Sequence, residues 1–255
     1  RENTEGLYHS LLRRCADRAA GRDPYEPPEM TFPGLEGEVA YDPRPISKHG
    51  SERISRMGFD IASRRSGAPG DGVSRVTCVD KSNVTRGCQL FRRTFDEVGE
   101  GYPGIERDYG YIDAFMQWIT RNPEHYDVVV SSNMFGDIST DLGAVLQGGM
   151  GMAGSANIGD HHAMFEPVHG SAPKHAGKGI VNPIASISSV QMMLDWLGRR
   201  NANDDLVEVA ELVGTAIADH VREGKQLTYA LGGTASTTDV GSSIAARLGD
   251  ALRER

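Results

Sequence analysis

The chain has 255 residues, of which 38% are hydrophobic and 24% charged, and its formal net charge is -8 with a pI of about 5.5. This composition is typical of a soluble globular protein, and it argues against a nucleic-acid-binding surface, which needs a basic stripe. No apolar run approaches the length of a membrane span, so we expect no membrane partner. The few cysteines form no disulfide or metal-binding pattern, which favours a cytoplasmic location; they are Cys15, Cys78 and Cys88.

Hydrophobic periodicity predicts that helices and strands alternate along the chain. The predicted elements, in chain order, are a helix over 51–65, a strand over 73–79, helices over 90–98 and 111–121, a strand over 127–131, a helix from 137, and helices over 183–197, 206–221 and 240–252. Ser51 is the predicted N-cap of the first helix. The alternation predicts an α/β fold in which helices cover both faces of a sheet.

Three stretches fall outside these elements. Residues 9–45 are polar and contain several Pro and Gly residues, so we predict an extended arm there. The glycine-rich stretch 148–154 predicts a flexible joint and a candidate domain crossing. The polar segment 1–8 is an unusual start for a domain, and we expect further strands of the sheet upstream of it.

The segment from Asp127 to Asp141 carries the most specific chemical signal. Its apolar run 128–130 predicts a buried strand, and Gly136 predicts a tight turn before a helix that starts near Asp137. Asp137 and Asp141 would then lie on one helical face, where two carboxylates can hold a hard cation such as Mg²⁺ or Mn²⁺. The alternative is that Asp137 merely caps the helix, which does not require Asp141.

Other candidate residues are weaker when each is taken alone. Lys81 and Asn83 follow a predicted strand directly, and a lysine at a strand end inside a cleft can act as a base, although most lysines are simply exposed. Asp113 lies on an otherwise apolar helix, where the alternative is a solvated flank. Arg1 can bind a carboxylate through two hydrogen bonds, and Tyr8 can donate a proton. The simpler interpretation is a surface arginine and a half-buried tyrosine.

A turn-rich segment precedes the predicted helix 183–197. Its small residues and backbone amides next to a helix start suit an adenosine and phosphate moiety, whereas the alternative is an ordinary loop. The sequence contains neither the G-x-G-x-x-G nor the P-loop fingerprint. The candidate cofactor-binding residues are Glu166, His169, Gly170, Ser171, Ala172, Pro173, Lys174, His175 and Asn182.

Taken together, these segments resemble the metal-dependent decarboxylating 2-hydroxyacid dehydrogenases, the isocitrate/isopropylmalate dehydrogenase family. The motifs follow the order of that family, and from Asp80 onward their spacing is close to that of the family. Its members include isocitrate, homoisocitrate, 3-isopropylmalate and tartrate/D-malate dehydrogenases. The resemblance implies an isopropylmalate-dehydrogenase-like two-domain α/β fold with a mixed sheet flanked by helices, whose N-terminal strands are missing here. It also implies that residues 1–148 form the small, dimerisation domain and residues 149–255 the C-terminal part of the large, cofactor-binding domain.

The resemblance also implies a role for each candidate residue. Arg1 corresponds to the arginine that binds the substrate carboxylates, and Asn83 to a neighbour of the substrate and nicotinamide. Tyr8 corresponds to the tyrosine that protonates the enol, and Lys81 to the lysine that helps to deprotonate the substrate hydroxyl. The metal-associated residues are Asp113, Asp137 and Asp141. In this family the lysine and the first aspartate reach the site of the other subunit, which implies a homodimer with shared active sites.

The expected reaction is the oxidative decarboxylation of a 2-hydroxy di- or tricarboxylic acid, with hydride transfer to NAD(P)⁺ and with Mg²⁺ or Mn²⁺. Lys174 stands where many NAD-using members have Asp, and its positive charge favours NADP over NAD. Residues 1–6, Arg-Glu-Asn-Thr-Glu-Gly, favour an isocitrate-like substrate, with 3-isopropylmalate and tartrate/D-malate as alternatives. A non-catalytic regulatory subunit on the same fold is disfavoured, because the implied catalytic and metal-binding residues are all present. Without the family's N-terminal portion, we expect this 255-residue piece alone to be inactive.

Overall fold

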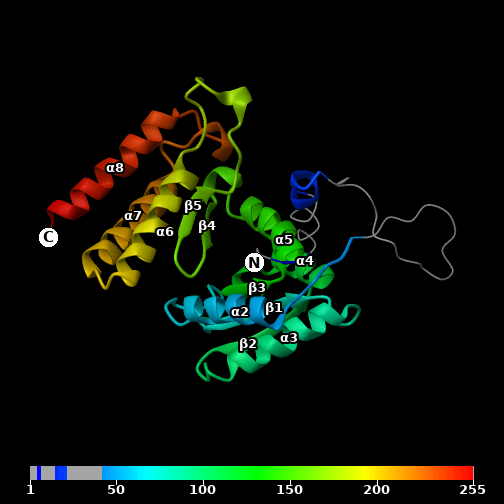
Figure 1. Cartoon of the computed structure of the whole chain (residues 1–255). Helices are drawn as coiled ribbons and strands as arrows, with labels where there is room; N and C mark the ends of the chain where they lie inside the picture. Colours follow the sequence, from blue (N-terminus) through cyan, green and yellow to red (C-terminus); the bar gives the residue numbers. More distant parts are fainter. Residues whose placement is uncertain (1–4, 7–14, 22–41, 255) are drawn as a thin grey trace. The chain divides into compact units, whose positions relative to one another are not determined.

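The computed structural model describes residues 5–6, 15–21 and 42–254 (Figure 1). Two of the predicted site residues, Arg1 and Tyr8, and most of the predicted arm lie outside the described residues. The chain divides into two compact units, Arg1–Thr140 and Asp141–Arg255. The division falls inside one helix, whereas the predicted domain boundary at 148/149 follows that helix. The assignment of the units to dimerisation and cofactor binding stays a prediction.

The first unit is built on a three-stranded parallel sheet with the order β2-β1-β3. Its elements are α2 (Lys48–Ala62), β1 (Arg75–Asp80), α3 (Arg86–Gly99), β2 (Glu106–Tyr111), α4 (Ile112–Arg121), the 3-10 helix η1 (Pro123–His125), β3 (Val128–Ser131) and the start of α5 (Asn133–Leu146). Every residue of the central strand β1 is buried, as expected for a parallel sheet covered on both faces.

Aromatic side chains form the core between this sheet and its helices. Phe59 of α2 stacks on Phe95 of α3 with ring centroids 5.1 Å apart, and on Tyr102 at 5.0 Å. Val76 and Val130 complete this cluster from β1 and β3. The close fit also constrains α2, because a Cβ on Gly58 would lie 2.3 Å from Cγ2 of Val130.

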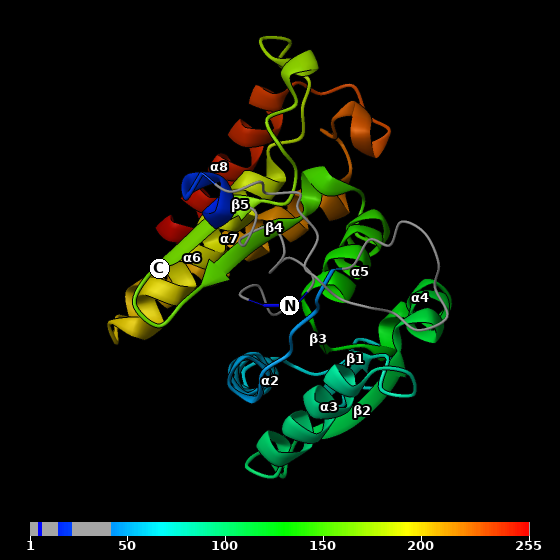
Figure 2. The ribbon, with the colours of Figure 1, turned by 45° about the vertical axis from the view of Figure 1, so that its right-hand side comes forward.

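The second unit combines an antiparallel pair of strands with three long helices (Figure 2). Its elements are the 3-10 helix η2 (Met150–Met152), β4 (Gly154–Ile158), β5 (Ala163–Pro167), η3 (Pro173–His175), α6 (Ile184–Arg200), α7 (Asp204–Glu223), η4 (Tyr229–Leu231) and α8 (Thr237–Arg253). Helix α6 packs against both strands and against α7, which in turn packs against α8. The predicted α/β fold class is confirmed, with the parallel strands and the antiparallel pair in separate sheets.

The structure corrects three local predictions. The first helix begins at Lys48 and is capped by Ser47, whose side chain accepts a hydrogen bond from the amide of Gly50; Ser51 is a buried residue inside the helix. Strand β2 was not predicted, because its sequence Glu-Arg-Asp-Tyr-Gly-Tyr is largely charged and exposed and runs into α4 without a turn signal.

The third correction concerns the helix that carries the two aspartates. Helix α5 begins at Asn133, so Asp137 lies in its second turn and does not cap it. Gly136 is a helical residue and not a tight turn, since its amide donates to the carbonyl of Ser132 at 2.8 Å. Because the helix starts earlier than predicted, Asp137 and Asp141 are both inside it, and the predicted common face is retained.

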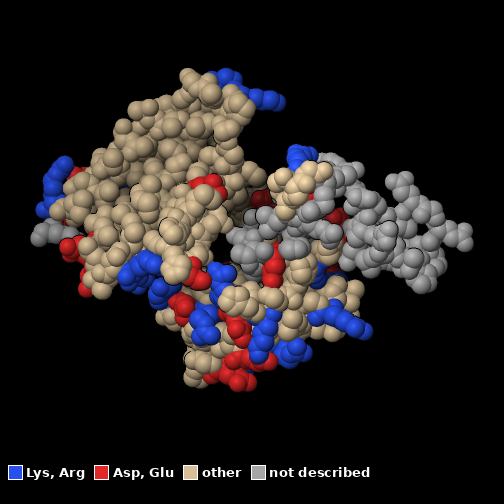
Figure 3. All heavy atoms as spheres, in the orientation of Figure 1, with Lys and Arg blue, Asp and Glu red and all other residues tan. Residues whose placement is uncertain are grey.

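Acidic and basic side chains are interspersed over the first unit on the face drawn in Figure 3. One example joins two helices, because Lys48 of α2 binds Glu97 of α3 at 2.7 Å. Within the described ranges of the chain, no helix is long and apolar enough to cross a membrane.

Candidate active site

The carboxyl ends of the three parallel strands bring most of the first unit's candidate residues to one edge of the sheet. Asp80 at the end of β1 is in register with Tyr111 at the end of β2, and Val79 with Ser131 at the end of β3. The hydroxyl of Ser131 donates to the carbonyl of Val79 at 2.9 Å, which joins the ends of β1 and β3. Lys81, Asp113 and helix α5 follow these three strand ends.

Lys81 and Asp113 form an ion pair at this edge. The side chain of Lys81 is 25% exposed and that of Asp113 is 66% exposed, so the pair is accessible to a substrate. The hydrogen bond from Lys81 is the largest cause that lowers the pKa of Asp113 below its ordinary value. Asp113 therefore remains a carboxylate at neutral pH, the form in which it can bind a cation.

Asn83 lies beside Lys81 in the turn between β1 and α3, where it is exposed. The amides of Val84 and Thr85 both donate to the carbonyl of Lys81 at 3.0 Å, which closes this turn. The side-chain amide of Gln89 donates to the carbonyl of Ser82 at 2.9 Å and joins the turn to α3. These bonds fix the backbone that presents Lys81 and Asn83.

Residues 5–6 are the described part of the N-terminal segment, and they lie at the start of α2. The amide of Ser47 donates to Oε1 of Glu5 at 2.7 Å, and the amide of Gly6 donates to the carbonyl of Pro45 at 2.9 Å. A Cβ on Gly50 would lie 2.8 Å from Oε1 of Glu5, so the absence of a side chain at residue 50 leaves room for this carboxylate. These contacts hold residues 5–6 against the start of α2.

Asp137 and Asp141 are four residues apart within α5, with Asp137 partly buried and Asp141 exposed. Their carboxylates are oxygen ligands of the kind that Mg²⁺ and Mn²⁺ prefer, so the residue types fit the implied cation. Among the residues that the structure describes, no group of three or more His, Cys, Asp or Glu side chains is placed to hold a metal. Asp113 is paired with Lys81, so the three aspartates do not form one cluster within this chain.

The predicted cofactor loop lies in the second unit, after β5. Glu166 is an exposed residue of β5, and the residues from Gly170 to Lys174 are exposed, with Ala172 in the left-handed region at φ 45°. Asn182 differs from the rest because its side chain is buried: its amide donates to the sulfur of Met152, and its oxygen accepts from the amide of Ile184. That side chain fixes the start of α6, and its predicted contact with the cofactor stays a prediction.

One residue near the loop has no signal in the sequence. Tyr229 of η4 is 53% exposed, and its ring centroid lies 6.2 Å from that of His175. The loop and the start of α8 are joined by Thr237, whose amide donates to Gly179 at 2.8 Å and whose hydroxyl donates to Val181 at 2.6 Å. This packing adds a phenol to the predicted cofactor loop.

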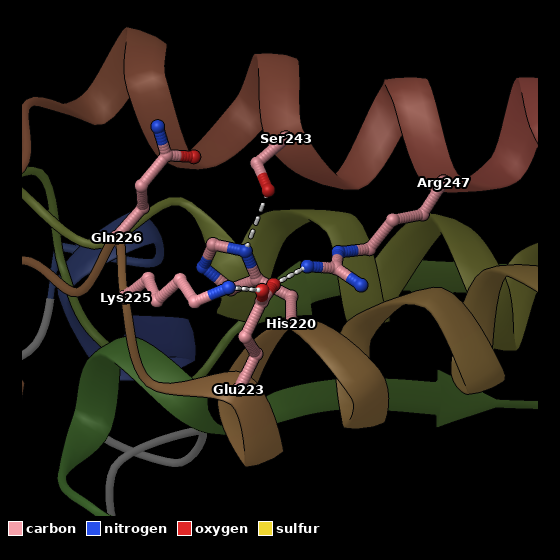
Figure 4. A pocket seen from close by; sticks show the side chains of 6 residues that line it. All are labelled: His220, Glu223, Lys225, Gln226, Ser243 and Arg247. Atoms are coloured by element: carbon pink, nitrogen blue, oxygen red, sulfur yellow. Dashed lines mark hydrogen bonds and ion pairs between the residues drawn. The ribbon is translucent and has the colours of Figure 1, made fainter.

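A separate pocket of about 250 Å³ lies between α7 and α8 (Figure 4). Its lining residues are His220, Glu223, Lys225, Gln226, Ser243 and Arg247, none of which belongs to the predicted site. Lys225 and Arg247 both bind the carboxylate of Glu223. His220 is buried with Nδ1 3.0 Å from Oγ of Ser243, and burial followed by the nearby Arg247 lowers its pKa. Glu223 thus neutralises both cations of the pocket, whereas Nε of Arg247 and Nε2 of His220 are buried without a hydrogen-bond partner among the described residues.

A family model described as isocitrate/isopropylmalate dehydrogenase matches residues 1–244. The chain belongs to this family. Homoisocitrate dehydrogenase of Methanocaldococcus jannaschii is 39% identical over 96% of this chain and 60% of its own length. The 3-isopropylmalate dehydrogenase of Archaeoglobus fulgidus is 41% identical over 86% of this chain and 64% of its own length.

A solved structure gives the same result for the fold. The crystal structure of isocitrate dehydrogenase from Methylococcus capsulatus superposes with a TM-score of 0.74 and 33% identity, over 96% of this chain and 65% of that chain. The chain therefore spans less than two thirds of the length of these relatives. The resemblance predicted from the sequence is confirmed at the level of the family and of the fold.

Proposed function

We propose that this protein catalyses the oxidative decarboxylation of a 2-hydroxy di- or tricarboxylic acid, with hydride transfer to NAD(P)⁺ and with Mg²⁺ or Mn²⁺ as the metal. The observation that carries the proposal is the ion pair of Lys81 and Asp113 at the sheet edge from which α5 also starts. A lysine and three carboxylates match what this chemistry needs, which is a base and a set of oxygen ligands.

Asp137 and Asp141 would hold the cation, together with Asp113 of a second copy of the chain. When bound, a divalent cation acidifies the substrate hydroxyl and stabilises the negative charge that develops as CO₂ leaves. Lys81 would accept the hydroxyl proton as a neutral amine, after its ammonium has left Asp113 and given its own proton to solvent. Tyr8 then donates a proton to the carbon that has lost CO₂, and Arg1 holds the substrate carboxylates.

The cofactor is proposed to be NADP. Lys174 supplies a positive charge in the exposed loop, and the rings of His175 and Tyr229 lie next to each other on the same loop and η4. A lysine and a phenol provide donors for a phosphate, which NADP carries on its ribose and NAD does not. Comparison of kcat/KM for the two cofactors tests the proposal, and a strong preference for NAD would overturn it.

The substrate is proposed to be isocitrate-like, on the basis of the Arg-Glu-Asn-Thr-Glu-Gly segment at residues 1–6. Two relatives are named for homoisocitrate and 3-isopropylmalate, so the panel for the assay includes both of these acids as well as tartrate and D-malate. The product NAD(P)H and the release of CO₂ are measured for each acid with and without Mg²⁺. Faster turnover with 3-isopropylmalate than with isocitrate would overturn the assignment of the substrate alone.

The proposal of catalysis itself is tested by Lys81→Ala and Asp137→Asn in the complete gene product. Each change is expected to lower kcat by at least about 100-fold, because it removes the base or a metal ligand, while the fold is retained. Lys225→Ala, a change at an exposed lysine outside the predicted site, is the matched control and is expected to keep full activity. Normal rates in both active-site variants, or effector binding without Mg²⁺-dependent turnover, would favour a non-catalytic subunit on the same fold.

A further inference from the structure

Arg92 of α3 reaches the same edge of the sheet, although it is not among the residues predicted from the sequence. Its Nε donates to Oδ2 of Asp80 at 2.8 Å, and its Nη2 donates to Oδ1 at 3.0 Å. Asp80 is 1% exposed and directly precedes Lys81. Oδ1 also accepts the amide of Ser82 at 2.8 Å, so both carboxylate oxygens are occupied.

The guanidinium of Arg92 also lies over two tyrosine rings of β2. Its central carbon is 5.1 Å from the ring centroid of Tyr109 and 5.3 Å from that of Tyr111. Residues two apart on a strand project from the same face, which explains how one side chain covers both rings. Tyr109 is itself fixed, because its hydroxyl donates to Asp96 at 2.5 Å, and burial followed by this bond raises its pKa to about 12.

Lys81 shares the second of these rings. Its amine lies 5.9 Å from the ring centroid of Tyr111, the residue that directly precedes α4, and Asp113 is the second residue of that helix. Arg92 and Lys81 therefore both lie near the ring of Tyr111. Each of these cations binds a different carboxylate, since Asp80 binds Arg92 and Asp113 binds Lys81. Because Arg92 occupies both oxygens of Asp80, the ammonium of Lys81 is kept away from the carboxylate of its own neighbour.

We propose that Arg92 and Tyr111 are positioning residues for Lys81, and that they hold its amine toward Asp113 and away from Asp80. The proposal rests on the catalytic role of Lys81 given above. Arg92 acts by binding both carboxylate oxygens of Asp80 and by repelling the ammonium of Lys81. Tyr111 acts by presenting its ring face to the guanidinium of Arg92 and to the ammonium of Lys81. Lysine cannot replace Arg92 in this arrangement, because a single ammonium does not bind both carboxylate oxygens in a planar fork.

The kinetic test compares Arg92→Lys and Arg92→Gln with Arg93→Lys and Arg93→Gln, since Arg93 is the exposed neighbour on the same helix. In the complete gene product, both changes at Arg92 are expected to lower kcat by about 10- to 100-fold, with the KM for the cofactor altered by less than about threefold. Tyr111→Phe keeps the ring and is expected to retain activity, whereas Tyr111→Leu is expected to behave like Arg92→Lys. Unchanged kcat in Arg92→Lys and in Tyr111→Leu would overturn the proposal.

A second measurement does not depend on activity. The chain has five lysines, Lys48, Lys81, Lys174, Lys178 and Lys225, so their ¹³C-dimethylated amines are resolvable and assignable by NMR. With Arg92 present, Asp113→Asn is expected to shift the Lys81 resonance. In the Arg92→Gln background, which adds no lysine, the same change is expected to leave the resonance in place, because Lys81 has turned to Asp80. An equal Asp113-dependent shift in both backgrounds would contradict the positioning role.

The two measurements separate the possible failures. If the wild type shows no Mg²⁺-dependent turnover with any acid of the panel, the proposed function fails, and the NMR comparison still tests whether Arg92 directs Lys81. If turnover is present and both Arg92→Lys and Tyr111→Leu are as active as Arg93→Lys, the positioning role fails and the function stands. Arg92→Lys retains the positive charge beside the buried Asp80, so its folding is less affected than that of Arg92→Gln, and the melting temperature of each variant verifies this.

Discussion

Lys81 and Asp113 bind each other at the ends of neighbouring parallel strands, and both come from one chain. Because β1 and β2 run in parallel, their carboxyl ends meet at one edge, and the residues that follow them are brought together although they are far apart in sequence. Both side chains are therefore presented at the same edge of one sheet. A dimer that offers Lys81 to its partner's site therefore offers Asp113 to the same site.

This relationship predicts complementation between two inactive variants. In the proposed homodimer with shared sites, Lys81→Ala and Asp137→Asn are each expected to be inactive as homodimers. A mixed dimer is expected to contain one site with an intact Lys81 from one copy and an intact Asp137 from the other. Random mixing makes half of the dimers mixed, with one intact site in two, so about one quarter of the wild-type activity is expected to return. Activity is measured after the two variants are co-expressed. Mixing Lys81→Ala with Asp113→Asn is the control, because both changes affect residues from the same side of a shared site, and the mixed dimer then has an altered residue in each of its two sites.

The proposed cofactor preference predicts the effect of reversing a charge in the loop. Lys174→Asp is expected to lower kcat/KM for NADP by about 10- to 100-fold, because an attractive charge near the ribose phosphate becomes repulsive, and to leave kcat/KM for NAD within about threefold. Lys178→Asp, four residues along the same segment, is the control and is expected to change neither ratio. Equal losses with both cofactors would show that Lys174 does not face the extra phosphate.

The buried His220 predicts how stability depends on pH. Burial lowers its pKa below the ordinary value of 6.5, so the unfolded chain takes up more protons than the folded one as the pH falls. Stability contributed by the neutral ring is therefore present above about pH 6.5 and is lost as the pH falls from there toward the lower folded pKa. Thermal unfolding of the wild type and of His220→Asn over this range measures the effect. The variant is expected to lose part of the pH slope, whereas His162→Asn at an exposed position is expected to keep it.

The contact between α2 and β3 predicts the sign of a helix substitution. Gly58→Ala would stabilise an isolated helix by about 1 kcal/mol, but the added methyl group would lie 2.3 Å from Val130. Overpacking of this kind costs about 1–3 kcal/mol, so a net loss of up to about 2 kcal/mol in the free energy of unfolding is expected. In the Val130→Ala background the clash is removed, and Gly58→Ala is expected to be neutral or stabilising. Denaturant unfolding of the four proteins measures this coupling, and additive effects would contradict the packing shown by the structure.

The sequence by itself determined the elements whose signal is local. The apolar runs predicted β1 and β3, helical periodicity predicted the long helices, and ordered motifs predicted the family that the comparisons confirm. The spacing of Asp137 and Asp141 predicted a common helical face, which is retained although α5 begins at Asn133. Such features depend on residues a few positions apart, and the chain's own periodicity is enough to specify them.

Only the tertiary structure decided which distant residues meet. Strand β2 has a charged, exposed sequence, and pairing with β1 makes it a strand; that pairing places Tyr109 and Tyr111 beside Arg92. The pairing of Lys81 with Asp113, of Arg92 with Asp80, and of His175 with Tyr229 likewise has no trace in local patterns. These contacts follow from the order and direction of strands and from helix packing, which depend on the free energy of the whole fold and not on any one segment.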